Sequence, residues 1–280
     1  MKQTRQIETA PGFAIVLAGR RIPGHRLILA VIFAVILAMI VTGLDWGWLG
    51  RWWPEIIRGV VISLLMLLGS VVLGFALAVP LGLMQLSPNI VLNGAARGFC
   101  TLIRGTPLLL QLWLIYFGLG SLFPHFPWIQ ESIFFPILRE GWPFGLLALT
   151  LSFAAYEGEV MRGSFASVPR GELQAGKAIG LSGWQLLRRI WFPRAFYQAL
   201  PTLVGETVLQ LKSTPLVATV TVIDIYAVLY QVRQETLLTY EPLLLLAAVY
   251  IILTGILVLL GRQIEMRIPG RRPSPSASSS

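Results

Sequence analysis

Residues 59–84 read GVVISLLMLLGSVVLGFALAVPLGLM and contain no charged side chain. A helix needs about 20 mainly apolar residues to cross the hydrocarbon core of a bilayer, which is roughly 30 Å thick. The run Leu64–Leu68 is continuous rather than alternating, which favours a helix over a strand of a membrane β-barrel. Apolar stretches near the required length recur at 27–44, 98–120, 144–163, 200–223 and 242–261. The sequence therefore predicts an all-α, polytopic membrane bundle of about six transmembrane helices.

The composition of the 280-residue chain fits the same class, because 55% of the residues are hydrophobic and only 12% are charged. The net charge of +9 does not indicate nucleic-acid binding, since the basic residues lie between apolar runs and form no continuous stripe. One cysteine and two histidines can build neither an internal disulfide nor a structural zinc site. We therefore expect no metal, no cofactor and no redox chemistry in this chain.

The two ends of the chain are expected to differ from the bundle. We interpret 1–26 as a cytoplasmic N-terminal segment and 27–44 as an additional, uncleaved membrane helix, because the apolar run is long and no cleavage site of small residues follows it. The C-terminal tail, 266–280, ends in a polar run rich in Ser and Pro and is predicted to be disordered.

Positive charges predict the orientation, because cytoplasmic flanks of membrane helices retain Lys and Arg. These residues concentrate in three places: the start of the chain, the 163–199 connection and the C-terminus. All three are predicted to face the cytoplasm, so both termini would be cytoplasmic. By alternation, the connections at 44–57, 121–141 and 224–240 are predicted to face outward.

The longest predicted internal connection carries the most informative segment, residues 171–193, which read GELQAGKAIGLSGWQLLRRIWFP. The pattern predicts one short helix, a turn permitted by Gly180, and a second short helix that ends at Pro193. Such a helix pair on the membrane face is suited to fill a groove on a soluble partner.

Here the chain resembles the permeases of binding-protein-dependent ABC importers. Their EAA signature is Glu-Ala-Ala, three residues, Gly, nine residues, Ile, one residue and Leu-Pro, and the same spacing occurs at Gln174-Ala175-Gly176, Gly180, Ile190 and Phe192-Pro193. Three identities differ from the signature, namely Gln174, Gly176 and Phe192. The resemblance implies a set of residues that couple the permease to an ATPase: Gln174, Ala175, Gly176, Gly180, Leu181, Ile190 and Pro193.

Further motifs resemble the polar amino acid branch of that family, close to the histidine/lysine/arginine/ornithine and opine permeases. They cover roughly 55–265, and the matching pieces are Arg104-Gly105-Thr106-Pro107 before Gln111 and Tyr116-Phe117-Gly118; Ala154-Ala155-Tyr156 with Glu159, Arg162 and Gly163; Val168-Pro169-Arg170-Gly171; Leu200-Pro201 followed by Glu206, Lys212, Ser213 and Thr214; and Asp224. The resemblance implies the type I permease fold of ABC importers over 55–265, with 27–44 as an addition to a five-helix core.

The resemblance also implies partners and a mechanism. Two permease subunits, this chain twice or this chain with a homologue, would enclose the pathway in a bacterial inner membrane. Each would dock 171–193 into one subunit of an ATPase dimer, where ATP and Mg²⁺ bind, while an external solute-binding protein delivers a polar solute. That solute is expected to be a cationic amino acid or an opine. ATP-driven closure of the ATPases would rock the bundle between two packings, and the permease itself would carry out no bond chemistry.

Five residues in or near the predicted spans are candidates for the substrate pathway: Glu157, Glu159, Glu206, Lys212 and Thr214. An ionised group at bilayer depth costs at least about 2.5 kcal/mol, so such groups are retained for a reason. The family usually has an uncharged residue at the position of Glu157. This additional carboxylate would contact a cationic solute. The alternative is purely structural: Glu159 pairs with Arg162 one turn away, and Glu206 and Lys212, on nearly the same face, form a second pair.

Two other functions predict features that differ from those of this sequence. An ion-coupled secondary transporter would use Glu159 or Glu206 to carry a proton, but such proteins commonly contain internal repeats, and none is evident here. A purely structural membrane subunit would not need the ordered 171–193 element. A near match to a phosphate-binding P-loop at 171–178 lacks the terminal Ser or Thr, since Ala178 has no hydroxyl to reach Mg²⁺.

Overall fold

The structure, a computed structural model, describes residues 14–17, 20–23, 28–29, 31–32, 35, 38 and 42–266. Most of the predicted N-terminal span 27–44, and all but the first residue of the predicted tail 266–280, lie outside the described residues. The chain divides into two units, 1–49 and 50–280. In the first unit, strands β1 (Ala14–Leu17) and β2 (Arg20–Pro23) pair antiparallel, with Ile15 opposite Ile22. The sequence analysis did not predict these strands.

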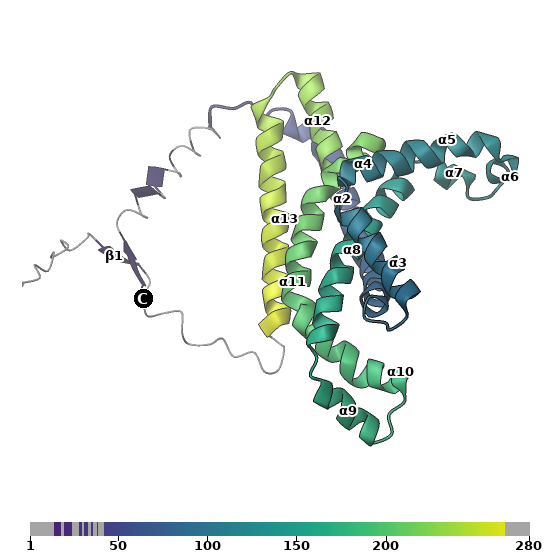
Figure 1. The fold of residues 1–280 in the computed structure, drawn as a ribbon. Coiled ribbons are helices and arrows are strands. Elements are labelled where there is room, and N and C mark those ends of the chain that lie inside the picture. The colour runs from purple at the N-terminus through teal and green to yellow at the C-terminus, as the bar shows by residue number, and fades with distance from the viewer. Residues whose placement is uncertain are drawn as a thin grey trace, which may run out of the picture. The chain divides into compact units, whose positions relative to one another are not determined.

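The regular elements described from Leu49 onward are helices (Figure 1). In chain order they are α2 (Leu49–Met84), α3 (Ile90–Arg104), α4 (Leu108–Trp113), the π-helix η1 (Leu114–Leu119), α5 (Gly120–Leu122), the 3₁₀ helix η2 (Phe123–His125), α6 (Pro127–Gln130), α7 (Phe135–Leu138), α8 (Trp142–Ser167), α9 (Arg170–Ala178), α10 (Gly183–Leu186), the π-helix η3 (Leu187–Trp191), α11 (Phe192–Ser213), the 3₁₀ helix η4 (Thr214–Val220), α12 (Ile225–Thr236) and α13 (Tyr240–Met266).

Three helices of the described part, α2, α8 and α13, are long and apolar enough to cross a membrane. Two further spans form only if helices on either side of a break are counted together: α3 with Leu108–Leu122, bent by 103°, and Gly183–Val220 with α12, bent by 56°. The described part thus has three spans, or up to five, and the predicted all-helical membrane class is confirmed. The sixth predicted span is the one at 27–44.

The predicted span 98–120 is not one straight helix, because the chain turns sharply at Gly105-Thr106-Pro107. Pro107 has extended backbone angles (φ −61°, ψ 132°) and offers no N–H to continue the helix. The side-chain amide of Gln111 donates to the carbonyl oxygens of Ile103 (2.6 Å) and Thr106 (3.0 Å). A break inside a bilayer requires such substitutes for the missing backbone bonds, so Gln111 stabilises the turn.

The predicted boundary between a span at 200–223 and an outward connection at 224–240 also needs correction. Helix α11 ends at Ser213, η4 follows, and most of the predicted connection is helix α12. Asp224 begins α12 by accepting a hydrogen bond from the N–H of Ala227 (2.9 Å), which is the usual role of an N-cap carboxylate. Thr221, with φ 67°, turns the chain between η4 and α12.

Helix α8 is the centre of the bundle, and 67% of its most apolar window is buried. Helix α2 approaches it closely through glycines. A Cβ added at Gly74 would lie 2.9 Å from Phe153 Cδ1, and a Cβ added at Gly82 would lie 2.9 Å from the backbone nitrogen of Arg162. Small residues permit this close packing of membrane helices. Gln210 of α11 donates to Ser70 Oγ of α2 and to the Leu149 carbonyl of α8, both at 3.0 Å. Helices α2, α8 and α11 are thus fastened together.

Candidate functional site

The coupling element, defined as residues 171–193, lies at the end of the bundle where α13 terminates, and α12 lies at the opposite end (Figure 1). Its two predicted short helices are present as α9 and α10. Gly180 has φ +84°, a conformation that favours glycine. The N–H of Leu181 donates to the Gly176 carbonyl (3.1 Å), which closes the turn. Ser182 and Gln185 then form a capping box that starts α10.

The two helices of the coupling element pack tightly at Gly176. This glycine is buried, and a Cβ there would lie 2.6 Å from Leu186 Cδ1 and 2.8 Å from Ile190 Cδ1. An alanine there would require the ends of the Leu186 and Ile190 side chains to shift. The side chains of Gln174 and Ala175 are exposed. Among the predicted coupling residues, the fold brings Gly176, Leu181 and Ile190 together, and leaves Gln174 and Ala175 free for a partner.

The prediction that Pro193 ends the second helix is wrong. The chain continues from α10 through η3 into α11, and Gly183–Val220 is one helical segment. Pro193 occupies the first turn of α11. Proline inside a continuous helical segment removes one backbone hydrogen bond, and the wider π turn directly before it, η3, accommodates that change.

A cavity of about 710 Å³ lies beside the coupling element. Glu172 and Arg194, which both line it, form an ion pair with a 3.0 Å contact between Glu172 Oε2 and Arg194 Nε. Gly176, Ile190 and Pro193 also line the cavity, together with Ala175, Ile179, Arg189 and Tyr197. An open cavity with an apolar floor and a charged rim is suited to receive a protein partner.

The acidic candidates within the bundle differ in their surroundings. Glu159 accepts a 2.9 Å hydrogen bond from Arg162 Nε, so the structural pairing that the sequence left open is present. Glu157 is fully buried, and neither of its oxygens has a hydrogen-bond partner among the described residues. Glu157 and Glu206 interact electrostatically. A buried carboxylate without hydrogen bonds, such as that of Glu157, is costly beside a second carboxylate unless a cation approaches it.

Arg104 lies next to this pair. It interacts electrostatically with Glu206, and its guanidinium stacks over the Tyr156 ring at 5.3 Å from the centroid. Both Arg104 and Tyr156 are exposed on the subunit. We call Arg104, Tyr156, Glu157 and Glu206 the acidic cluster. Helices α3, α8 and α11 therefore bring together side chains that lie about 100 residues apart in the sequence.

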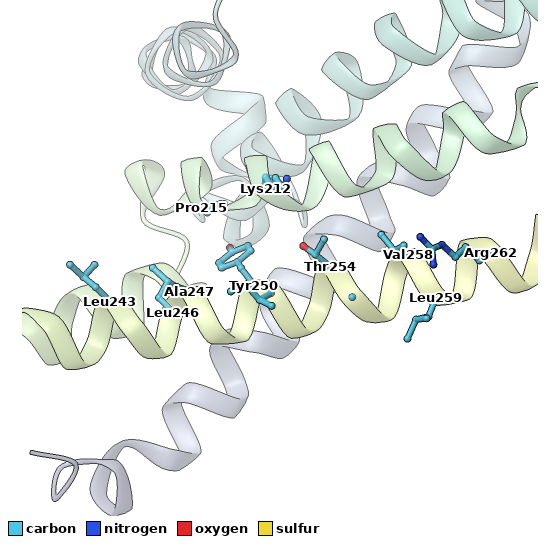
Figure 2. Close-up of a pocket in the computed structure, with 12 residues that line it drawn as sticks. Lys212, Pro215, Leu243, Leu246, Ala247, Tyr250, Thr254, Val258, Leu259 and Arg262 are labelled. Carbon is cyan, nitrogen blue, oxygen red and sulfur yellow. The ribbon is translucent and has the colours of Figure 1, made fainter. Parts of the chain in front are cut away.

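Lys212, near the end of α11, and Thr214, the first residue of η4, lie toward α13. Lys212 is exposed and lines a groove of about 750 Å³ between the two helices (Figure 2). Thr214 is buried, and its hydroxyl is 3.1 Å from the hydroxyl of Tyr250, so it is a packing residue in this structure. None of the ion pairs in the described part joins Glu206 to Lys212. Six residues turn a helix through about 600°, which places the two side chains about 120° apart and not on the same face.

Sequence reasoning missed two buried amides. Gln210 joins three helices, and Gln85 lies 3.5 Å from both Cys100 Sγ and the Gly158 carbonyl. The available signal was an amide within an apolar run, because such a group must find partners in a bilayer.

An apolar helical bundle with an exposed helix pair at one end and ionisable groups within its spans defines the class: a membrane subunit of a transporter. Residues 70–268 match the profile of the family described as the binding-protein-dependent transport system inner membrane component. The chain belongs to this family, and it is a permease subunit of an ABC importer. It is a transport subunit rather than an enzyme, because in this family the ATPase is a separate subunit.

Named relatives agree with this assignment. The chain is 36% identical over 229 residues to the octopine transport system permease protein of Rhizobium radiobacter, covering 81% of this chain and 92% of that one. It is 34% identical to the arginine ABC transporter permease protein of Haemophilus influenzae, covering 76% and 92%. It is also 34% identical to the histidine/lysine/arginine/ornithine permease protein of Salmonella typhimurium, covering 79% and 93%.

Solved structures show the same fold. An amino acid ABC transporter crystallised with histidines has a TM-score of 0.68 and 26% identity, and the match covers 80% of this chain and 99% of that one. An inward-facing methionine ABC transporter has a TM-score of 0.63 at 17% identity, covering 80% and 98%. The comparisons do not support an ion-coupled secondary transporter.

Proposed function

We propose that this permease imports a cationic amino acid or an opine, delivered by an external solute-binding protein. The names of three relatives support this substrate class, since they specify octopine, arginine, and histidine, lysine, arginine or ornithine. Most of these compounds carry a positively charged side chain at neutral pH. A pathway that admits them needs negative groups.

The observation that carries the proposal is Glu157. Its carboxyl group is fully buried without a hydrogen-bond partner, and it interacts electrostatically with Glu206. Two neighbouring carboxylates repel each other in a medium of low dielectric. A guanidinium or ammonium group between them would relieve this repulsion and form charge-assisted hydrogen bonds. Glu157 and Glu206 therefore contact the cationic end of the solute, and Glu159, which pairs with Arg162, does not.

The coupling element transmits the ATPase motion in the proposed mechanism. Gln174 and Ala175 contact the ATPase directly, and Gly176, Gly180, Leu181, Ile190 and Pro193 maintain the shape of the element. ATP and Mg²⁺ bind at the partner ATPase dimer, and two permease subunits enclose the pathway. Both termini face the cytoplasm in this proposal. For the C-terminal side, the orientation is supported by the position of the coupling element at the same end of the bundle as the end of α13 (Figure 1), and for the N-terminus by its positive charges.

Reconstitution tests the proposal. The permease, its ATPase and the binding protein are incorporated into proteoliposomes, and uptake of radiolabelled L-arginine is measured. We expect uptake that requires ATP and the binding protein, and no uptake driven by a pH gradient alone. Uptake with a pH gradient in the absence of ATP would contradict the proposed coupling.

Glu157→Gln tests the substrate contact in the same assay. Loss of one charge-assisted contact is expected to raise the KM for arginine by about tenfold, which corresponds to about 1.4 kcal/mol. The matched control is Glu131→Gln, which removes an exposed carboxylate in the predicted outward connection. Equal KM values for the wild-type protein and Glu157→Gln would refute the role of Glu157.

A further inference from the structure

A pocket of about 430 Å³ lies where α2, the start of α8 and the turn before α12 meet. Residues 221–223 of this turn line the pocket, so it lies at the α12 end of the bundle, opposite the coupling element (Figure 1). Two close approaches fix its walls. A Cβ added at Gly59 would lie 2.9 Å from the Cα of Ile225, and a Cβ added at Gly141 would overlap the carbonyl oxygen of Val220. The three elements that form the pocket are therefore held in fixed positions.

The pocket lies at the boundary between the lipid headgroups and the hydrocarbon core. Arg58 lines it and is the last charged residue before the uncharged stretch 59–84 of α2. Trp142, the first residue of α8, also lines it, and Trp side chains favour the membrane–water interface. Further along α2 the lining continues with Ile62 and with Leu65, which is 60% exposed. One end of the pocket is thus polar, and the other end is apolar and faces the acyl chains.

Two opposite charges line the polar end of the pocket, namely Arg58 and Glu140, which precedes α8 by two residues. Both side chains are exposed, and none of the ion pairs of the described residues includes either of them. A separate cation and carboxylate in one pocket are complementary to a ligand that carries both an anion and a cation. At this depth in a bilayer, zwitterionic phospholipids combine such a headgroup with apolar chains.

We propose that this pocket binds a zwitterionic phospholipid with a primary amine, such as phosphatidylethanolamine. The phosphate contacts Arg58, the ammonium group contacts Glu140, and an acyl chain lies along Ile62 and Leu65. A guanidinium forms charge-assisted hydrogen bonds with a phosphate, and pockets between membrane helices recognise headgroups in this way. Under the proposed orientation the lipid belongs to the outer leaflet. The inference does not depend on which solute the permease transports.

The carboxylate of Glu140 determines which headgroup fits. A primary ammonium group has three N–H donors, and these can form hydrogen bonds with a carboxylate. The quaternary ammonium group of phosphatidylcholine has no N–H donor. Phosphatidylglycerol has no cation at all, so it would leave Glu140 without a partner. We therefore expect the pocket to select phosphatidylethanolamine over both of these lipids.

Native mass spectrometry of the purified complex of permease and ATPase tests the proposal. The delipidated complex is titrated in detergent with phosphatidylethanolamine, phosphatidylcholine or phosphatidylglycerol with identical acyl chains, and bound lipids are counted. We expect one saturable phosphatidylethanolamine per permease subunit, bound about tenfold more tightly than either other lipid. Arg58→Met should weaken this binding by about tenfold, and Arg58→Lys, which retains a cation, should keep most of it. Glu140→Gln should abolish the preference over phosphatidylcholine.

The matched controls are Arg51→Met and Glu55→Gln, which remove exposed charges of α2 outside the pocket and should leave lipid binding unchanged. Copurification of the ATPase checks that each variant folds, and Glu140→Gln decides the proposal if Arg58→Met does not fold. Equal binding of the three lipids by the wild-type complex would overturn the proposal, as would an unchanged lipid preference in Glu140→Gln. Loss of the second permease subunit or of the solute-binding protein from the variants, with unchanged lipid binding, would also overturn it and would make the pocket a protein contact.

Discussion

At the residue scale, Gly176 shows how one missing methyl group shapes the coupling element. Its position against Leu186 and Ile190 leaves less room than an ordinary van der Waals contact. The family signature has alanine at this position. From the sequence alone, Gly176 is therefore only a departure from that signature. The structure indicates closer packing of α9 against the helical segment that leads into the membrane.

Gly176→Val is expected to separate α9 from that segment. Overpacking of this kind typically lowers the free energy of unfolding by about 1–3 kcal/mol. We expect the bundle to fold and less ATPase to copurify with the permease, by a factor of about ten. The matched control is Gly171→Val in the same helix, where an added Cβ meets nothing within 4 Å. Equal copurification of both variants would contradict the packing argument.

Some residue-scale features could be predicted from sequence and others could not. The pairing of Glu159 with Arg162 follows from their spacing of one helical turn, and the structure contains it. The isolation of Glu157, and its nearness to Glu206, depend on how α8 packs against α11. Helical spacing within one segment carries no information about that contact.

At the element scale, the break at Gly105-Thr106-Pro107 is the largest difference from the sequence prediction. Hydropathy makes 98–120 one apolar stretch and does not indicate the size of a bend within it. The 103° bend depends on Gln111, whose amide reaches back to the Ile103 carbonyl. A pattern of apolar residues cannot reveal such a bond, because it forms only after the chain has turned.

Gln111→Leu should therefore destabilise the turn. It removes the amide hydrogen bonds to Ile103 and Thr106 and leaves their carbonyl oxygens without these donors, at a cost of about 1–2 kcal/mol. The thermal unfolding midpoint of the detergent-solubilised permease should fall by several degrees, roughly as expected for a domain of this size. Gln231→Leu, which replaces an exposed amide on α12, serves as the control. If both variants unfold at the same temperature, Gln111 does not stabilise the turn.

At the scale of the whole molecule, the fold class followed from the sequence because bilayer thickness sets a minimum length that few soluble helices reach. The number of spans did not follow as directly. Two of the described spans are bent pairs of helices, and a window of mean hydropathy averages across such breaks. The candidate site was found only in part, since its acidic cluster is assembled from α3, α8 and α11.

The proposed orientation can be checked by chemical labelling, because the single native cysteine, Cys100, is buried. Gln174→Cys and Trp128→Cys each introduce a thiol at an exposed position. A membrane-impermeant maleimide should label the Trp128→Cys protein in spheroplasts, and should label the Gln174→Cys protein only in inverted vesicles. Labelling of the Gln174→Cys protein from outside would reverse the proposed topology and remove the basis for ATPase docking.

The uninterrupted helical segment Gly183–Val220 begins in the coupling element and contains both Glu206 and Lys212. Because this segment joins the proposed ATPase contact to the proposed solute contact at Glu206, we expect the two binding events to be thermodynamically linked. If bound ATP changes the affinity for arginine by some factor, bound arginine must change the affinity for ATP by the same factor. Nucleotide titrations on the complex of permease and ATPase in lipid nanodiscs, with and without saturating arginine, should therefore give the same ratio of affinities as arginine titrations with and without a non-hydrolysable nucleotide.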